Sequence, residues 1–438
     1  MSVNVESVMD FSDIASHPLF KTERLDGVMN AFTQSANSTL LGPFIPFRTV
    51  NSDVIEMDID VPQRGGMTPL ATMGSAAPMY HIGSGRQRRK FEAPVWKEKV
   101  SIQGHELYDL RELGTKEGLK TATSLLADKI AHLEERLVNR MEWSRRQFLF
   151  DQQVVGQMTN GQQVVFNYSN HASYMRVTAG VLWSNVATAD PIDDIMQWAE
   201  TYRRYSPFKL DTLILPIGTM RRLTKLERFR DIMNSSHGSF NGSSTAIKAE
   251  FQAWGFNNIM ESDESINSLS RVMATVSNGD TAITVENASM LEANDIIEIT
   301  NVESGERELL TVVSVASNVI TVSAPGVART AGYAAGDLVG WNKYIIPENK
   351  ALILGVSKGQ KFATTGNQAA IDRTKIDNFA AFTSTIARDS DLKNPKPGVF
   401  RKTIDKTNDD PAALYQILGV QGLIEMFEGR AHMVATIF

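Results

Sequence analysis

The chain has 438 residues, of which 42% are hydrophobic and 21% are charged. This length predicts two or more packed units, and the composition excludes an intrinsically disordered chain. A total of 44 Lys and Arg against 50 Asp and Glu gives a formal net charge of -6, which argues against a protein that coats nucleic acid through phosphate contacts. The absence of cysteine excludes disulfides, cysteine nucleophiles and thiolate metal sites.

Signals for export and for membrane insertion are absent from the sequence. The N-terminus has no basic region followed by an apolar run, so we expect no secretory signal. No stretch reaches the roughly 18 consecutive apolar residues that a membrane-spanning helix needs. We therefore expect a soluble protein that is made in a cytoplasm and has no membrane partner.

Residues 1–50 are mixed in character and rich in turn formers. A helix is predicted near Lys21–Gln34, and Pro43 and Pro46 then interrupt regular structure. The segment is more typical of an arm than of a domain.

The next segment, 51–105, predicts an extended β-hairpin. Val54–Val61 alternates apolar and acidic residues with a period of two, which indicates a half-exposed strand. A polar tract rich in Gly and Met follows, and strand-like alternation returns in residues 92–107. The connection is too long for a tight turn, and loops of this length are usually functional.

This hairpin holds the candidate interaction residues of the chain. One basic cluster and one methionine-rich stretch are singled out: Arg86, Arg88, Arg89 and Lys90, and Met67, Met73 and Met79. The basic cluster is consistent with docking onto an acidic surface of a neighbouring subunit, with binding to nucleic acid, or with a solvated loop. The methionines are consistent with an adaptable contact surface or with an ordinary flexible loop.

The strongest helix signal covers Thr115–Phe150. Apolar or small residues recur every three or four positions and form one stripe: Leu119, Ala122, Leu126, Ile130, Leu133, Leu137 and Met141. Charged residues form the opposite face, and no proline interrupts the segment. Taken alone, such a helix also suits a coiled coil or a bundle, although its flanking segments lack a heptad pattern.

A compact α/β unit is predicted next. A short hairpin turns at Thr159–Gly161, because Asn-Gly tolerates the positive φ angles of such turns. Asp190 caps a helix that has Pro191 at its first position and continues to Tyr205. The remaining elements are a buried strand in DTLILP, helices over Thr219–Met233 and Ala246–Trp254, and a strand near Asn258–Glu261.

The residue pattern changes over residues 273–341. Five or six short β-rich runs, spaced about ten residues apart and separated by glycine turns, predict a small inserted barrel or sandwich. Strand-like segments then continue to the last residue, which indicates that the C-terminus is tied into the fold.

The sequence contains no motif that supports catalysis, cofactor binding or metal binding. The seven histidines are scattered without metal-ligand spacing, no glycine-rich loop has the pattern of a nucleotide site, and no Gly-x-Ser-x-Gly elbow is present. We therefore expect no catalytic residues, no cofactor and no metal, and the protein is not predicted to be an enzyme.

The order of these elements resembles the major capsid protein of tailed bacteriophages, with the Hong Kong 97 type fold that encapsulins share. The resemblance implies an α+β fold with these parts: an N-terminal arm at 1–50, an extended loop at 51–105, a peripheral domain at 106–185 and 380–438 with its spine helix at 115–150, an axial domain at 186–272 and 342–379, and an inserted β domain at 273–341.

The function implied by the resemblance is structural. The chain would assemble with itself, as hexamers and pentamers, into an icosahedral shell that encloses double-stranded DNA without sequence-specific binding. An arm and an extended hairpin bury little within one subunit, so neighbours would stabilise both. The shell would form in the host cytoplasm and become the virion capsid.

Further partners and alternatives remain open at this point. Fewer than sixty residues precede the extended loop, which suggests a separately encoded scaffolding protein; a portal and a decoration protein are further partners. The inserted domain would bind a decoration protein or the host surface, or join neighbouring subunits. A tail-tube or baseplate protein and an encapsulin-like compartment are the alternatives to a capsid.

Overall fold

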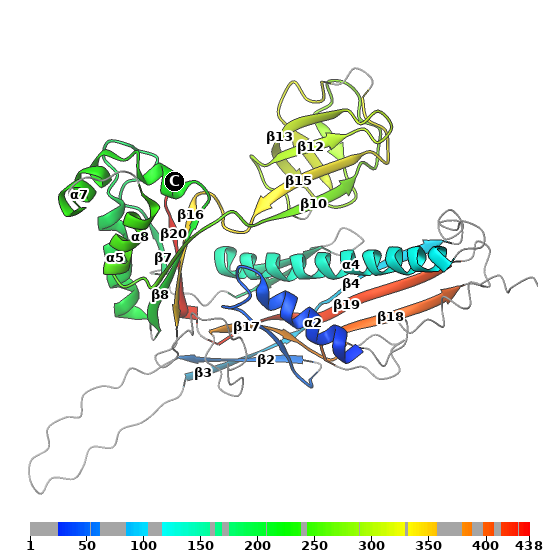
Figure 1. Cartoon of the computed structure of the whole chain (residues 1–438), viewed down its shortest axis with the longest axis horizontal. Coiled ribbons are helices and arrows are strands. Elements are labelled where there is room, and N and C mark those ends of the chain that lie inside the picture. Colours follow the sequence, from blue (N-terminus) through cyan, green and yellow to red (C-terminus); the bar gives the residue numbers. More distant parts are fainter. Residues whose placement is uncertain are drawn as a thin grey trace, which may run out of the picture. The chain divides into compact units, whose positions relative to one another are not determined.

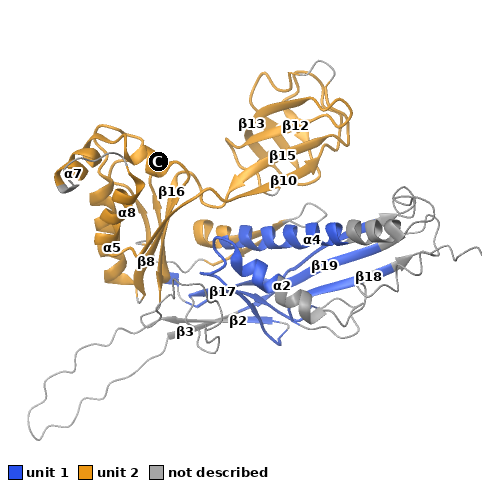
Figure 2. Ribbon diagram, in the orientation of Figure 1, with its two compact units in different colours: residues 1–145, 363–429 blue, residues 146–362, 430–438 orange. Residues whose placement is uncertain are grey.

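The computed structural model describes residues 25–52, 54–61, 85–103, 116–157, 163–168, 175–206, 208–237, 243–288, 290–328, 332–356, 379–387, 397–406, 413–427 and 429–438. The chain divides into two compact units (Figure 2). Unit 1 comprises Met1–Arg145 and Ala363–Gly429, and unit 2 comprises Arg146–Phe362 and Arg430–Phe438. Both units combine helices with sheets, so the predicted α+β class is confirmed.

The sheet of unit 1 is built around a long strand, β19 (Ala413–Met426). Strand β18 (Val399–Lys406) pairs with the first part of β19, and β17 (Ala380–Ser384) pairs with the last part. Strand β4 (Val95–Gln103) pairs with β19 along its opposite edge. At Gly419 a Cβ would lie 2.5 Å from a ring carbon of β18, so the strands can approach closely there only because glycine has no side chain.

The described part of the predicted arm packs within unit 1. It contains helix α2 (Leu25–Ser38) and strand β1 (Phe47–Thr49), which pairs parallel with β17. The Phe47 ring stacks on Phe382 with 6.2 Å between the ring centroids and meets Phe32 edge-on at 5.8 Å. Residues 25–49 are therefore held by their own subunit, whereas the sequence suggested a segment that depends on neighbours.

The hairpin differs from the sequence prediction in its second strand. Strand β2 (Val54–Val61) forms where it was expected, and it pairs antiparallel with β3 (Gly85–Glu92). Residues 85–92 belong mostly to the tract that was assigned to the loop. The segment expected to return the hairpin instead forms β4, which pairs with β19 from Val95 to Gln103, because a strand in a multi-stranded sheet is more stable than one in a two-stranded ribbon.

The predicted long helix is confirmed. Helix α4 (Lys116–Asp151) has 36 residues and starts and ends one residue later than the expected Thr115–Phe150. Figure 1 shows it running alongside β4, β19 and β18. The predicted solvent-facing side does not persist to its end, because every residue from Met141 to Phe150 is buried, including one glutamate and two arginines.

Unit 2 has a five-stranded sheet in the order β7-β20-β16-β8-β9. The strands are β7 (Arg176–Thr178), β20 (His432–Thr436), β16 (Lys350–Val356), β8 (Lys209–Pro216) and β9 (Asn258–Ser262). The central strand β16 is antiparallel to both of its neighbours, and the two edge strands are parallel to theirs. The C-terminal segment is thus paired on both edges, as the sequence predicted, but in unit 2 and not with the rest of the predicted peripheral segment 380–438.

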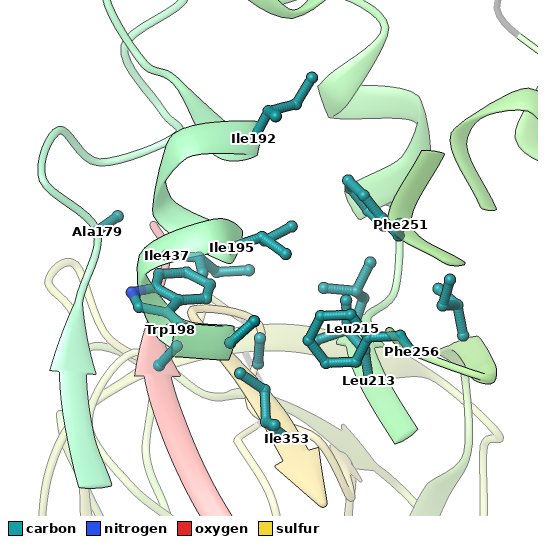
Figure 3. Close-up of a cluster of buried hydrophobic side chains, with 14 of the residues drawn as sticks. Ala179, Ile192, Ile195, Trp198, Leu213, Leu215, Phe251, Phe256, Ile353 and Ile437 are labelled. Carbon is teal, nitrogen blue, oxygen red and sulfur yellow. The ribbon is translucent and has the colours of Figure 1, made fainter. Parts of the chain in front are cut away.

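Four helices contribute buried residues to the core beside this sheet, part of which is shown in Figure 3. They are α5 (Pro191–Tyr205), α6 (Thr219–Leu223), α7 (Glu227–His237) and α8 (Ser244–Ala253). As predicted, Asp190 caps α5, with its side chain accepting a hydrogen bond from the Asp193 amide. The core combines aromatic residues of the helices, such as Trp198 and Phe251, with aliphatic residues of the strands, such as Leu213.

The helix expected over Thr219–Met233 is divided into α6 and α7. The amide of Glu227 donates to the carbonyl of Val186 at 3.1 Å in place of an intrahelical acceptor. Leu223 and Leu226 are both buried at the break. Burial of both leucines in the core therefore overrides the continuous helical periodicity.

A short hairpin follows α4 as predicted. Strands β5 (Gln153–Gln157) and β6 (Gln163–Asn167) pair antiparallel. The Asn-Gly turn expected at 159–161 lies outside the described residues.

The inserted β domain is present and has a core of its own. Its sheet has the order β10-β15-β12-β13-β14-β11, with β10 (Ser265–Arg271), β11 (Ala282–Thr284), β12 (Ile296–Thr300), β13 (Arg307–Ala316), β14 (Val319–Val322) and β15 (Leu338–Tyr344). It begins eight residues before the predicted 273, because SINSLSR in β10 has too few apolar residues to be recognised as a strand. The amide of Ile345 donates to the carbonyl of Glu264 at 2.9 Å, so the chain enters and leaves the domain at adjacent points.

Candidate subunit interface

Two arginine side chains of helix α4 contact residues of β4. Arg136 makes a two-pronged ion pair with Glu98, with Nε to Oε2 at 2.6 Å and Nη2 to Oε1 at 2.9 Å. One turn further along the helix, the Arg140 guanidinium lies 4.1 Å from the centroid of the Trp96 ring. Burial lowers the pKa of Arg140 to about 10, so the arginine remains charged at neutral pH.

The same helix also meets β18. Burial raises the pKa of Glu134, and the nearby positive charge of Arg401 lowers it in part. Arg401 is itself oriented by β19, because its Nε donates to Oε1 of Gln416 at 3.0 Å. The helix therefore contacts β4 directly and lies near a charged residue of β18, so helix and sheet form one layer of unit 1.

A buried polar cluster joins the end of α2 to α4. Glu142 accepts hydrogen bonds from the Leu41 amide and from the Thr39 hydroxyl, both at 2.7 Å. Arg145 Nη1 donates to Glu142 Oε2 at 2.9 Å and to the Ala36 carbonyl at 2.8 Å. We call these five residues the arm anchor.

The charges of the arm anchor are shielded from water. The side chains of Arg145 and Glu142 are 0% and 4% exposed. Burial lowers the pKa of Arg145, while the neighbouring Glu142 raises it. Hydrogen bonds to the remaining polar atoms offset part of the desolvation cost of a buried charge pair. Residues 36–41 supply three hydrogen-bonding groups to the pair: the Ala36 carbonyl, the Thr39 hydroxyl and the Leu41 amide. The arm and the helix therefore depend on each other.

The predicted basic cluster lies on β3, directly across from acidic residues of β2. The register partners are Arg86 with Asp60, Arg88 with Asp58, and Lys90 with Glu56, whereas Arg89 is opposite Met57. The sequence analysis did not connect the two groups, although the acidic residues belong to the alternating row that predicted β2. Met67, Met73 and Met79 lie outside the described residues.

The described residues show no metal-binding cluster and no membrane-spanning helix. Within those ranges, no group of three or more His, Asp or Glu side chains is arranged to hold a metal ion. None of the helices in the described part of the chain is long and apolar enough to cross a membrane.

The architecture therefore consists of a spine helix fixed on a sheet, an arm strand that joins that sheet, a separate hairpin, and an α/β unit that carries an inserted domain. The family model described as "Phage major capsid protein E" matches residues 22–255, just over half of the chain, and the chain belongs to that family. It is a shell-forming structural protein of a phage, and the Hong Kong 97 type fold expected from the sequence is confirmed.

Solved structures of similar proteins include proteins of prophages and phages. A prophage protein of Escherichia coli CFT073, provisionally described as a capsid protein, is 12% identical with a TM-score of 0.48, covering 95% of this chain and 99% of its own. A phage-related protein of Bordetella bronchiseptica RB50 is 8% identical with a TM-score of 0.43, covering 93% and 96%.

A third similar structure is that of Mycobacterium phage Bobi, which is 9% identical with a TM-score of 0.39 and covers 98% of this chain and 99% of its own. These likenesses are too distant to carry an argument about residues or partners. No curated protein sequence matches the chain. The assignment therefore rests on the family match.

Proposed function

We propose that the chain is the major capsid protein of a tailed phage, and that it assembles as hexamers and pentamers into an icosahedral shell around double-stranded DNA. The observation that carries the proposal is the family match, which spans the arm, the hairpin, the spine helix and the first part of the α/β unit. The layer that α4 forms with its sheet supplies the wall of such a shell.

We also propose the division of labour among the segments. Residues 1–50 serve as the arm and 51–92 as the extended loop. The peripheral domain comprises β4, α4 and the sheet of β17, β18 and β19, and the axial domain comprises the sheet of β7, β20, β16, β8 and β9 with its helices. The inserted domain comprises 265–344. The candidates for contact with neighbouring subunits are Met67, Met73 and Met79 and the basic cluster of Arg86, Arg88, Arg89 and Lys90, in which Arg89 alone is not opposite an acidic residue of β2.

The partners follow from the same proposal. A separately encoded scaffolding protein would guide assembly in the host cytoplasm, a portal would occupy one vertex, and a decoration protein would bind outside. The enclosed DNA would be confined and not gripped, because a subunit with a net charge of -6 has no excess of cations to neutralise phosphates.

The proposal is tested by electron microscopy of the purified protein, in the presence and absence of the phage's other structural proteins. Closed shells or capsomers of megadalton mass are expected. Tubes or small rings would instead support a tail-tube or baseplate protein. Shells that contain an enzyme cargo would support an encapsulin-like compartment, and a compact monomer under all conditions would refute all three functions.

A further inference from the structure

The hairpin of β2 and β3 carries opposite charges at opposed positions. All three acidic residues of β2 have a basic register partner on β3: Glu56 with Lys90, Asp58 with Arg88, and Asp60 with Arg86. Directly opposed residues of an antiparallel pair share one face, with their Cβ atoms about 4.5–5.5 Å apart. Three consecutive same-face positions are thus occupied by ion-pairing residue types.

This arrangement is specific to the observed register. A slip by one residue would place Asp58 opposite Gln87 or Arg89, and it would leave Asp60 opposite an uncharged residue. A slip by two residues in either direction retains two opposed pairs, and in one direction it also places Glu56 opposite Glu92. Only the observed register opposes all three carboxylates to cations.

Other interactions fix the base of the hairpin but not its length. At the base, Ile55 is 3% exposed, and the Ile386 amide donates to the Ser52 carbonyl at 3.0 Å. Further along, β2 and β3 pair only with each other among the described strands. An isolated two-stranded ribbon is marginally stable in water, so small contributions from cross-strand pairs decide whether it forms.

We propose that these three opposed charge pairs hold the hairpin in register within a single subunit, so that it is a folded β ribbon before the subunit meets a neighbour. Arg86, Arg88 and Lys90 then act inside the hairpin and do not dock onto an acidic surface elsewhere. The six charges also cancel, which removes the repulsion that like-charged hairpins would experience when subunits gather.

The test is a charge swap in the full chain, measured by hydrogen exchange of the backbone amides of 54–61 and 85–92 in unassembled subunits. Arg88→Asp and Asp58→Arg each place like charges opposite one another and should accelerate exchange of the paired amides about threefold to tenfold. The double variant D58R/R88D restores an opposed pair and should return exchange to within about twofold of the wild type.

Arg89→Asp is the matched control, because it makes the same change one residue away, opposite Met57. It should leave exchange within about twofold of the wild type. The proposal is overturned if D58R/R88D exchanges as fast as the single variants, or if R89D accelerates exchange as much as R88D does.

A second readout, the yield of assembled particles, rests on the proposed function. Docking onto a neighbour would leave D58R/R88D as defective as R88D, because the neighbour's acidic surface would face an aspartate. The internal pairs predict recovery in the double variant. Failure of the wild type itself to form particles would count against the proposed function alone, since hydrogen exchange in the free subunit does not depend on assembly.

Discussion

Glu142 and Arg145 hold the end of α2 with charges that water does not reach. Each is stabilised by the other and by hydrogen bonds to residues 36–41. Removing one partner of a buried pair is costly because it leaves an uncompensated charge, whereas replacing both partners with apolar residues is far less harmful.

Glu142→Gln is expected to lower the free energy of unfolding of unit 1 by about 3–5 kcal/mol. The substitution removes the negative charge opposite Arg145, and its amide group presents donors to the Thr39 hydroxyl or the Arg145 guanidinium. Urea unfolding of unassembled subunits, followed by tryptophan fluorescence and circular dichroism, measures the loss.

The control is Glu135→Gln on the same helix, where the glutamate side chain is 68% exposed and the change should be within about 0.5 kcal/mol. The double variant E142Q/R145M should be more stable than E142Q alone, because it removes the uncompensated charge. Equal stability of E142Q and E135Q would show that the buried pair contributes nothing.

The role of Glu142 could not have been predicted from the sequence. Its local pattern, with charges every few residues along a helix, is the pattern of a solvated face. Its burial depends on residues 36–41, which lie about a hundred positions earlier in the chain. A signal was present in the aromatic and aliphatic residues that surround the charges in MEWSRRQFLF, a composition unusual for a solvent-facing turn.

Among the structural elements, the inserted domain is the most self-contained. Residues such as Ile297, Val312 and Trp341 form a core of their own. Lys343 forms ion pairs with Glu292 and Asp295, both at 2.8 Å and both within the domain. The residues that flank the domain, Glu264 and Ile345, are joined by a backbone hydrogen bond.

Replacing residues 265–344 with Asn-Gly should therefore leave the rest of the chain folded. Asn-Gly closes a tight hairpin turn, and the adjacent ends need no further linker. We expect the melting temperature of the remaining chain to stay within a few degrees of the full-length value, measured by far-ultraviolet circular dichroism. Loss of helical signal at 25 °C would instead show that the domain is part of the core of unit 2.

A shorter excision serves as the comparison. Removing 275–340 with the same two-residue linker leaves Trp341 without the core that buries it, and it leaves Leu269, Ser270 and Arg271 at the end of β10 without strand partners. This variant should aggregate more readily than the longer excision. Equal solubility of the two variants would contradict the boundaries derived from the hydrogen bond at Glu264.

At this scale the sequence predicted which segments are strands better than which strands pair. The alternation at 54–61 identified β2, and the long helix was located to within one residue at each end. The predicted partner of β2 was wrong because β3 has no apolar alternation. The β3 sequence, GRQRRKFE, is typical of a loop unless the acidic strand across from it is considered. Pairing depends on a second segment, which local periodicity does not include.

For the molecule as a whole, the net charge of -6 has a measurable consequence. We expect unassembled subunits to have no measurable affinity for double-stranded DNA at 150 mM salt, because binding without sequence specificity requires an excess of phosphate-neutralising cations. An electrophoretic mobility-shift titration checks this, with 20 mM salt as the condition that favours weak contacts. A mobility shift of the DNA at 150 mM salt would contradict the proposal that the shell encloses DNA without binding it.

The position of β20 also constrains the order in which the protein can fold during synthesis. Residues 432–436 lie between β7 and β16, which precede them in the chain by more than two hundred and fifty and by about eighty residues. The sheet of unit 2 therefore stays open along two strand edges until residues 432–436 have been synthesised. Nascent subunits still attached to neighbouring ribosomes cannot present a finished unit 2, which delays their assembly until synthesis has passed residue 436.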